Sequence, residues 1–500
     1  MKRIDTNSLY SHDMQKKSDL FAENYKEFLN NSKTEREAID SIVNEITDKG
    51  YIELSEAVKS GKKLVEGDKI YSVWMNKSIV FFQIGKESME RGINILGAHI
   101  DSPRMDVKQN PLYEDGGLAF LDTHYYGGIK KYLFVALPLA LHGVVVRKDG
   151  TTVELSVGED EDDPVFFISD LLVHLSAEQL TKKASEVIEG EALDLVVGSR
   201  PLIIDKKDKS DSKEENVDEK LSKGQQYALD AENEESELKA KAQGAVKRGI
   251  LAILKDEYGI EEEDFISAEL EVVPAGKARD AGFDRALVLG YGQDDRVCAY
   301  PSMRALLDTK KLSRTSCCIL VDKEEIGSVG ATGMSSHFFE NAVAEVLGLM
   351  DGYSELSLRR CLANSCMLSS DVSAAFDPSY KSVFEEKNSC YLGKGMVFNK
   401  YTGSRGKYSS NDANAEFMAH IRSIFDKEKI NFQTAELGKV DKGGGGTIAY
   451  ILARYGMNVI DSGVAVLNMH APWEATAKTD IYETYRGYKA FIENASLTND

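Results

Sequence analysis

Short apolar runs that alternate with helix-like segments are the feature of this sequence that most restricts its fold. Each run ends in a polar loop, and the five runs are 93–98, 286–290, 317–321, 366–368 and 464–467. Their length and composition are typical of buried strands, and we expect all of them in one central sheet. Helical patterns lie between them, at 297–307, 338–349, 415–425 and 448–454. This alternation predicts an α/β fold with a central mixed sheet flanked by helices.

A further helix is predicted near the start of the chain. Ile39, Ile42, Val43 and Ile46 fall on one face of a helix of 3.6 residues per turn. The pattern begins after polar residues and ends before Gly50, so the sequence predicts an amphipathic helix over 34–49.

The middle of the chain has a different pattern. Strand-like runs occupy 131–146 and 152–157, and a charged stretch follows at 205–243. That stretch has too few apolar residues to order itself, so we expect a mobile loop or a solvated helix there. We therefore predict a catalytic domain made of 1–104 and 281–500, interrupted by an inserted β-rich domain at 105–280.

Charge and hydropathy exclude several classes of partner. With 61 basic and 82 acidic residues the formal net charge is -21, which repels phosphate backbones and anionic bilayers. The longest apolar stretch, 132–146, contains Pro138. It is shorter than the run of about 18 residues that a membrane span needs, so we interpret it as buried core. We expect neither a nucleic-acid partner nor a membrane.

The start of the chain and the cysteines indicate a cytoplasmic protein. Residues 1–21 are polar and lack the apolar segment of a secretory signal. Six cysteines in 500 residues are too sparse for a disulfide framework, and none forms a C-x-x-C pair. We expect them to be reduced and structural.

Residues suited to metal binding follow the apolar runs in turn. They are His99 and Asp101 after the first, Asp294 and Asp295 after the second, Glu324 and Glu325 after the third, Asp371 after the fourth, and His470 after the fifth. Taken singly, each has an ordinary alternative as a core histidine, a helix N-cap or a solvated turn. Ligands bind at the carboxyl ends of strands in open α/β sheets, so together these residues can converge. They supply one His and one terminal carboxylate for each of two metals, a bridging Asp, and a spare glutamate to take a proton from water.

Other catalytic classes fit the sequence less well. It has no G-x-S-x-G elbow, no G-x-x-x-x-G-K-[ST] phosphate loop and no H-E-x-x-H helix. The glycine run 443–446 lacks the Lys-Ser/Thr pair of a phosphate loop. It can either offer backbone N–H groups to a substrate oxygen or form a flexible loop before a helix.

The ordered motifs HIDSP, QDDR, KEEIGS, SSDVS and NMHAPWE resemble the M18 family of metalloaminopeptidases, whose best-known members are the aspartyl aminopeptidases. The resemblance runs from His99 to the end of the chain, with an inserted domain after the first motif. It implies a two-metal exopeptidase that acts on peptides with a free N-terminus. It also implies that the inserted domain mediates dimerisation and that dimers assemble into a tetrahedral dodecamer.

The resemblance also implies a role for each site residue. His99 and Asp371 resemble ligands of one ion, Glu325 and His470 resemble ligands of the other, and Asp294 resembles the bridge between them. Glu324 resembles the general base, and Asp101 the acid that tunes His99, with Asp295 standing beside the bridge. The implied cofactor is a pair of divalent ions, zinc first, with manganese or cobalt as alternatives.

Substrate preference is predicted from fewer residues. The family name implies N-terminal Asp or Glu, and Lys400, with Arg405 and Lys407 as rivals, lies near the position of the family's basic substrate residue. Asp170 stands where animal members carry a His that reaches a neighbouring subunit's site, which argues against a strict acidic preference. Two alternatives stay open, a neutral or broad specificity with the same chemistry and a non-catalytic scaffold or cargo protein with this fold.

Overall fold

The computed structural model describes residues 3–202, 244–350, 352–403 and 406–496, which form two compact units. Unit 1 comprises Met1–Arg104, Tyr126–Lys130 and Gly276–Asp500, and unit 2 comprises Met105–Tyr125 and Lys131–Ala275. The sequence placed both 126–130 and 276–280 in the insertion, whereas in the structure they belong to unit 1. The charged stretch 205–243 and Arg405 lie outside the described residues.

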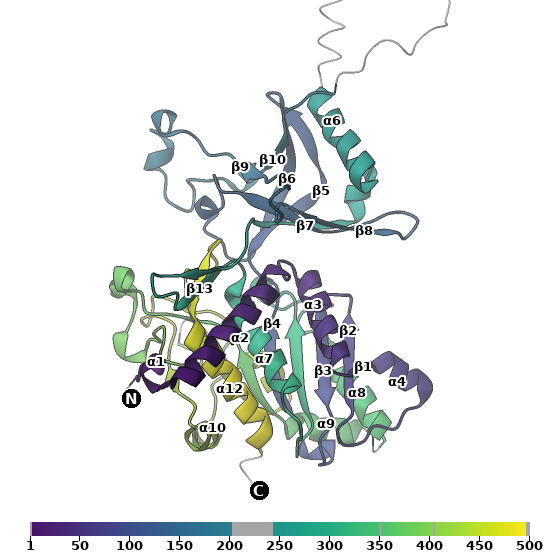
Figure 1. The fold of residues 1–500 in the computed structure, drawn as a ribbon, viewed down its shortest axis with the longest axis vertical. Helices are drawn as coiled ribbons and strands as arrows, with labels where there is room; N and C mark the ends of the chain where they lie inside the picture. The colour runs from purple at the N-terminus through teal and green to yellow at the C-terminus, as the bar shows by residue number, and fades with distance from the viewer. Residues whose placement is uncertain (1–2, 203–243, 351, 404–405, 497–500) are drawn as a thin grey trace, which may run out of the picture. The chain divides into compact units, whose positions relative to one another are not determined.

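A mixed sheet forms the centre of unit 1 (Figure 1). Within the described residues its strand order is β1-β2-β3-β14-β4-β15-β19-β17-β18. In that order the strands are Ile52–Glu53, Lys69–Trp74, Ser78–Gln83, Ser316–Val321, Asn94–His99, Cys366–Ser370, Asn458–Gly463, Met396–Asn399 and Phe432–Thr434. Strands β14, β4, β15 and β19 run parallel, so their carboxyl ends meet at one edge.

Both faces of this sheet are buried, as strand β14 shows. Cys318 and Leu320 pack into one apolar cluster, and Cys317, Ile319 and Val321 pack into the other. Because successive side chains of a strand point to opposite faces, an unbroken apolar run needs helices on both sides. The prediction of a central mixed sheet flanked by helices is confirmed.

Two groups of helices supply those layers (Figure 1). The first cluster contains side chains of α2 (His12–Asn30), α3 (Glu35–Asp48), α7 (Gln293–Leu307), α10 (Ala415–Glu428) and α12 (Lys478–Asn494). The second contains α4 (Leu54–Ser60), α8 (Phe338–Met350), α9 (Glu355–Ala363) and α11 (Ala449–Ala453). The short helix α1 (Thr6–Leu9) precedes α2. No described helix has both the length and the hydropathy of a bilayer-crossing segment.

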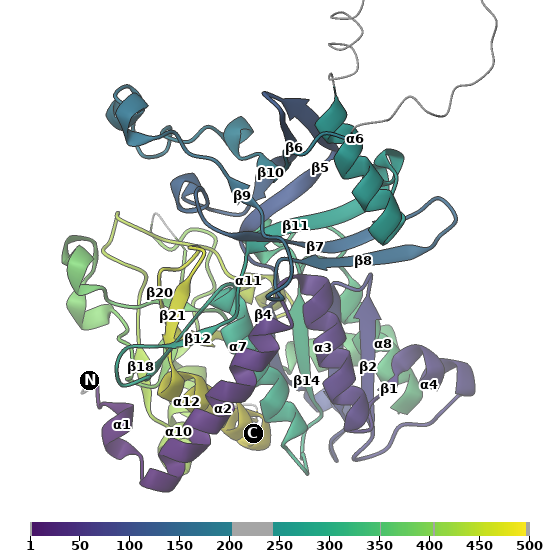
Figure 2. The same cartoon turned by 45° about the horizontal axis from the view of Figure 1, so that its top comes forward.

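A second sheet of unit 1 corrects one expectation. The runs 286–290 and 464–467 were expected in the central sheet, but they form β13 (Leu287–Gly290) and β20 (Ala465–Leu467) of a separate sheet (Figure 2). Its order is β12-β13-β21-β20-β16, completed by Arg279–Ala281, Glu474–Ala477 and Ser373–Ala374. The expectation was wrong because runs of four or five residues do not specify their pairing partners.

Unit 2 is built on a sheet of its own, with strand order β8-β7-β11-β5-β6-β10-β9 among the described residues. The strands are Thr152–Val157, Leu139–Val146, Ala268–Pro274, Arg104–Asp115, Leu118–Tyr126, Leu195–Gly198 and Phe167–Ile168. Helix α6 (Ala245–Ile253) continues as a π-helical turn through Tyr258. Most of β7 is buried, which agrees with the prediction of buried core for 139–146, whereas 132–138 lies outside the strand and is largely not buried.

Candidate metal centre

The parallel strands of the central sheet deliver the first half of the site. His99 is the last residue of β4, Glu324 and Glu325 follow β14, and Asp371 follows β15 directly. Pairing of β4 with both neighbours is parallel, and Val321 lies opposite His99. The short turn after β14 therefore carries the two glutamates to the same edge as the imidazole.

The second sheet delivers the other half. Asp294 lies at the start of α7, just after β13, and His470 lies in the turn between β20 and β21. Gly292 permits this entry into α7, since its φ is +71° and a Cβ there would lie 1.9 Å from Nη1 of Arg296. The peptide bond between Asp294 and Asp295 is cis.

Asp294 connects the two halves. Its Oδ1 lies 3.1 Å from Nε2 of His99, and its Oδ2 lies 3.2 Å from Nε2 of His470. Nε2 of His470 also lies 3.5 Å from Oε1 of Glu325. Two groups of potential ligand atoms result, His99 with Asp294 and Asp371, and Asp294 with Glu325 and His470, each within 4.8 Å. Asp294 belongs to both, with one oxygen facing each histidine.

The other ring nitrogen of each histidine is already engaged. Nδ1 of His99 lies 3.0 Å from the carbonyl oxygen of Asp101, and Nδ1 of His470 lies 3.0 Å from that of Gly128. An Nδ1–H that donates to a carbonyl leaves the Nε2 lone pair free, which is the tautomer a metal ligand needs.

Asp101 supports the two glutamates as well as His99. Its carboxylate accepts hydrogen bonds from the backbone N–H groups of Glu324 and Glu325, each at 3.1 Å, and from the hydroxyl of Tyr126 at 2.8 Å. One of its oxygens lies 3.3 Å from Nδ1 of His99. This fully buried carboxylate therefore fixes the turn after β14 against the end of β4.

The pKa values of the carboxylates indicate that the protein alone does not supply enough positive charge to neutralise this cluster. Burial, reinforced by the charge of Asp294, raises the pKa of Glu325 well above its usual range, and burial with neighbouring acids does the same for Asp371. Burial also raises the pKa of Glu324 to about 7. At Asp294 burial opposes ionisation, yet His470 and His99, which donate from Nε2 when protonated in the absence of metal, hold its pKa below the usual range. Such a cluster is stable in its ionised form only when cations neutralise it.

Zinc fits this donor set. Neutral imidazoles and carboxylates are ordinary zinc ligands, and a second contact that orients each imidazole is typical of such sites. The six cysteines are free and buried, and none of them occurs in the two ligand groups.

Glu474 is a residue of this site to which the sequence analysis assigned no role, although it ends the NMHAPWE motif. Its carboxylate is 2% exposed and accepts the N–H of Asp294 at 3.1 Å and the N–H of His470 at 3.0 Å. Its own carbonyl accepts a hydrogen bond from Gln293 at 2.6 Å. A buried acid four residues after His470 was the available signal, but only the fold shows that it reaches Asp294.

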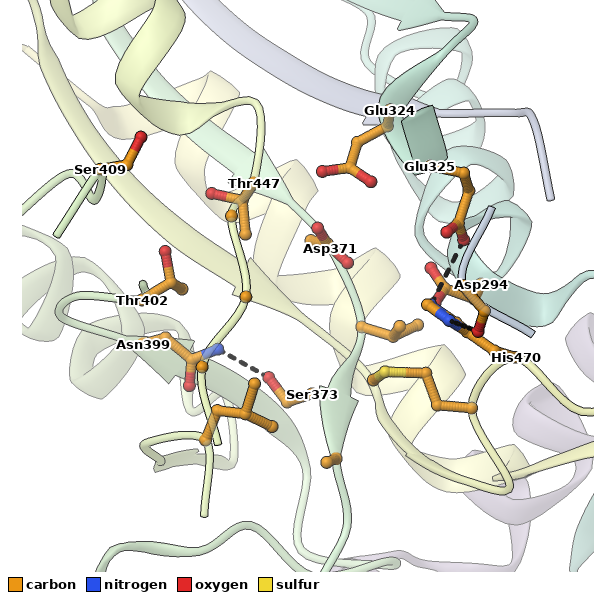
Figure 3. A pocket seen from close by; sticks show the side chains of 18 of the residues that line it. Asp294, Glu324, Glu325, Asp371, Ser373, Asn399, Thr402, Ser409, Thr447 and His470 are labelled. Atoms are coloured by element: carbon orange, nitrogen blue, oxygen red, sulfur yellow. Dashed lines mark hydrogen bonds and ion pairs between the residues drawn. The ribbon is translucent and has the colours of Figure 1, made fainter. Parts of the chain in front are cut away.

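The cluster lines a cavity of about 500 Å³ within unit 1 (Figure 3). One side, called here the acidic side, presents Asp294, Glu324, Glu325, Asp371 and His470. The opposite side, called here the neutral side, presents Ser373, Asn399, Thr402, Ser409 and Thr447. Part of the glycine run, 444–446, lines the cavity as well.

Lys400 does not line this cavity. Its ammonium forms an ion pair with Asp412, and Lys407 binds the other oxygen of the same carboxylate at 2.9 Å. Asn399, one residue earlier, lines the cavity instead. Successive side chains at the end of β17 point in opposite directions, and this places Asn399 inside and Lys400 outside.

The model of the family described as aminopeptidase I zinc metalloprotease (M18) matches residues 28–492. A probable M18 family aminopeptidase 1 of Clostridium acetobutylicum is 56% identical over 490 residues, covering 98% of each chain. The crystal structure of an M18 aminopeptidase from Thermotoga maritima has a TM-score of 0.86 at 40% identity, covering 99% of this chain and 100% of that one. That of aminopeptidase I from C. acetobutylicum has a TM-score of 0.81 at 53% identity, with the same coverage.

More distant relatives carry further names. A probable aspartyl aminopeptidase of Ricinus communis is 24% identical over 485 residues, covering 94% of each chain. The structure of the S. cerevisiae mApe1 dodecamer is 19% identical, with a TM-score of 0.71, and shows the fold alone. Together with the match over nearly the whole chain, the relatives at 40% identity and above decide the family. This chain belongs to the M18 family of zinc metalloaminopeptidases.

Proposed function

We propose that the chain removes the N-terminal residue of peptides with two divalent ions, one bound by His99, Asp371 and Asp294 and the other by Asp294, Glu325 and His470. The observation that carries this proposal is the placement of Asp294, whose two oxygens face the two imidazoles at 3.1 and 3.2 Å. A carboxylate shared in this way is the natural bridge of a two-metal site. Zinc is the expected ion, in line with the family description.

The reaction divides between the ions and the side chains. When bound, the ion pair polarises the scissile carbonyl and lowers the pKa of water. Glu324 belongs to neither ligand group, so its carboxylate is free to take a proton from the attacking water and deliver it to the leaving amine. Asp101 holds the backbone of Glu324 and thereby positions this base.

Binding of the substrate's free N-terminus follows from the same charges. The acidic side holds four carboxylates, and Asp101 beside His99 adds a fifth, so two divalent ions offset four of five negative charges. An ammonium group is therefore favoured beside them, whereas an acylated N-terminus has no charge to offer. This is the basis on which we propose exopeptidase rather than endopeptidase activity.

Assembly and location are proposed on less direct grounds. We propose that unit 2 mediates dimerisation and that dimers build a dodecamer, an arrangement supported by the name of the yeast relative. A cytoplasmic location stays a prediction, consistent with the free state of all six cysteines. The acidic substrate preference predicted from Lys400 also stays a prediction, and the contacts of that residue do not favour it.

Hydrolysis of aminoacyl substrates tests the proposal. The purified protein should cleave substrates with a free N-terminus, lose this activity with a chelator and regain it with zinc, manganese or cobalt. Metal analysis should give two ions per chain. The N-acetylated form of each substrate is the control and should not be cleaved. If no substrate is cleaved under any metal, the alternative of a scaffold or cargo protein gains support.

A further inference from the structure

The neutral side of the cavity carries a polar group that the reaction does not use. Asn399 donates a hydrogen bond from Nδ2 to Oγ of Ser373 at 2.8 Å. Its Oδ1 is shielded from solvent and has no hydrogen-bond partner in the described part of the chain, and the same holds for Oγ1 of Thr402. A shielded, unpartnered acceptor and hydroxyl on a cavity wall are suited to bind a ligand.

Positive charge is missing from this wall. Among the described residues that line the cavity there is no lysine or arginine. Lys400 and Lys407 both bind Asp412, so this carboxylate neutralises part of their charge outside the lining. A carboxylate on a substrate side chain would lose its water here without gaining a cation, and burial of such a charge is unfavourable.

Negative charge lies close by. Glu436 lines the cavity and belongs to neither ligand group, so its charge comes in addition to the carboxylates that bound ions would offset. A hydrogen bond to Glu436 raises the pKa of the Tyr401 hydroxyl to about 12, together with burial, so the two side chains are in contact. An incoming aspartate or glutamate side chain would therefore be repelled as well as desolvated.

Apolar surface completes the wall. Val372, Ala374, Ala435 and Leu437 line the cavity together with Met469. Alkyl groups of a substrate can pack against them, while the amide of Asn399 and the hydroxyl of Thr402 can bind an uncharged polar group.

We propose that this cavity selects N-terminal residues with uncharged side chains over aspartate and glutamate, and that Asn399 is the residue that determines the selection. The proposal rests on the proposed aminopeptidase activity and names its substrate class. It assigns no role in selection to Lys400. A lysine in place of Asn399 would set a cation on the wall, in the position that an acidic side chain needs.

The experiment compares kcat/KM for aminoacyl substrates with N-terminal Leu, Ala, Asp, Glu and Lys. The metal-loaded wild type should cleave the Leu or Ala substrate at least about tenfold better than Asp or Glu. Asn399→Lys should shift the Asp/Leu ratio by about tenfold toward Asp, mainly through KM. Lys400→Met is the matched control, which removes a cation one residue away and should leave the ratio unchanged.

Several results would overturn the proposal. These are a wild type that prefers Asp, Glu or Lys, or a Lys400→Met variant that loses cleavage of acidic substrates selectively. If Asn399→Lys does not fold, inhibition of the wild type by free L-leucine and L-aspartate replaces it, and stronger inhibition by aspartate contradicts the selection. Absence of cleavage for all five substrates would instead contradict the proposed aminopeptidase activity. Failure of the proposed selectivity can therefore be distinguished from failure of the proposed function.

Discussion

The acidic and neutral sides of one cavity are built in different ways. The acidic side collects side chains from the segments that follow β14 and β15 and from two connections of the second sheet. The neutral side uses hydroxyl and amide groups from β16, from the last residue of β17 and the loop after it, and from the loop before α11. A buried charge needs a bound ion or an oppositely charged partner, so the acidic side requires particular residue types that can be recognised as motifs in the sequence. Burial of a neutral polar group costs much less free energy, so the neutral side has no comparable motif.

Asp294→Ala should have the largest effect, because it removes the carboxylate that both ligand groups share. Activity should fall by about 10⁴-fold or more, and metal content should drop for both ions. Metal analysis of the purified variant together with steady-state kinetics tests this. Ser373→Ala, on the neutral side, should retain both ions. Equal metal loss in the two variants would break the contrast between the sides.

Glu324→Gln should come next. The amide keeps the shape of the side chain but cannot accept the proton, so turnover should fall by about 10²- to 10⁴-fold while two ions remain bound. Glu436→Gln makes the same chemical change on another part of the cavity wall. It should change kcat on a Leu substrate by less than about fivefold. Normal turnover in Glu324→Gln would remove this residue from its proposed role as base.

Glu474→Gln tests whether the connection between the halves of the acidic side matters. Both N–H groups that Glu474 accepts lose an anionic partner, and one of them, that of Asp294 or that of His470, faces an NH2 group and loses its acceptor. Zinc affinity should fall by about 10- to 100-fold, as measured by competition with a chromophoric chelator.

Glu483→Gln is the matched control for that variant. Glu483 is also fully buried, and it accepts hydrogen bonds from Tyr10 and from the backbone of Asn431. Its replacement should lower thermal stability without changing zinc affinity. Should both variants bind zinc equally, Glu474 would have only a structural role.

Asp461→Asn changes the residue that binds Thr447 of the neutral side, and it should have the smallest effect on activity. Burial raises the pKa of Asp461 from 3.8 to about 7, and Thr447 donates a 2.6 Å hydrogen bond to it. Between these pH values the folded protein keeps a proton that the unfolded chain has lost. The contribution of Asp461 to the free energy of unfolding is therefore greatest at low pH and falls as pH rises toward 7.

Asparagine does not titrate, so the stability of Asp461→Asn relative to wild type should increase from pH 4 to pH 8. The full increase is on the order of 4 kcal/mol, since one pKa unit corresponds to about 1.4 kcal/mol. Urea denaturation at several pH values measures it. Asp412→Asn is the control. The two lysine partners of Asp412 lower the pKa of this exposed carboxyl, so it does not titrate between pH 4 and pH 8. A pH-independent difference for Asp461→Asn would contradict the expectation.

The helices illustrate how far local pattern carries a prediction. The apolar residues Ile39, Ile42 and Ile46 predicted α3 correctly. Thr34 caps its N-terminus and forms a capping box with Glu37. Helix α12 was not predicted from the sequence. It buries polar residues such as Asp480 and Glu483 alongside apolar ones, so its buried face is not a purely apolar stripe. Asp480 accepts the N–H groups of Gly393 and Gly395, partners that are invisible to a local pattern.

By itself the sequence determined the fold class, the family and the candidate ligands, because buried strands and buried charges both require particular residue types at short spacing. Tertiary structure alone decided that two sheets share the site, that Glu474 joins Asp294 to His470, and that Asn399 rather than Lys400 lines the cavity. Strand partners and the direction of a single side chain depend on contacts between distant segments. A one-residue shift along a strand reverses which side chain faces inward.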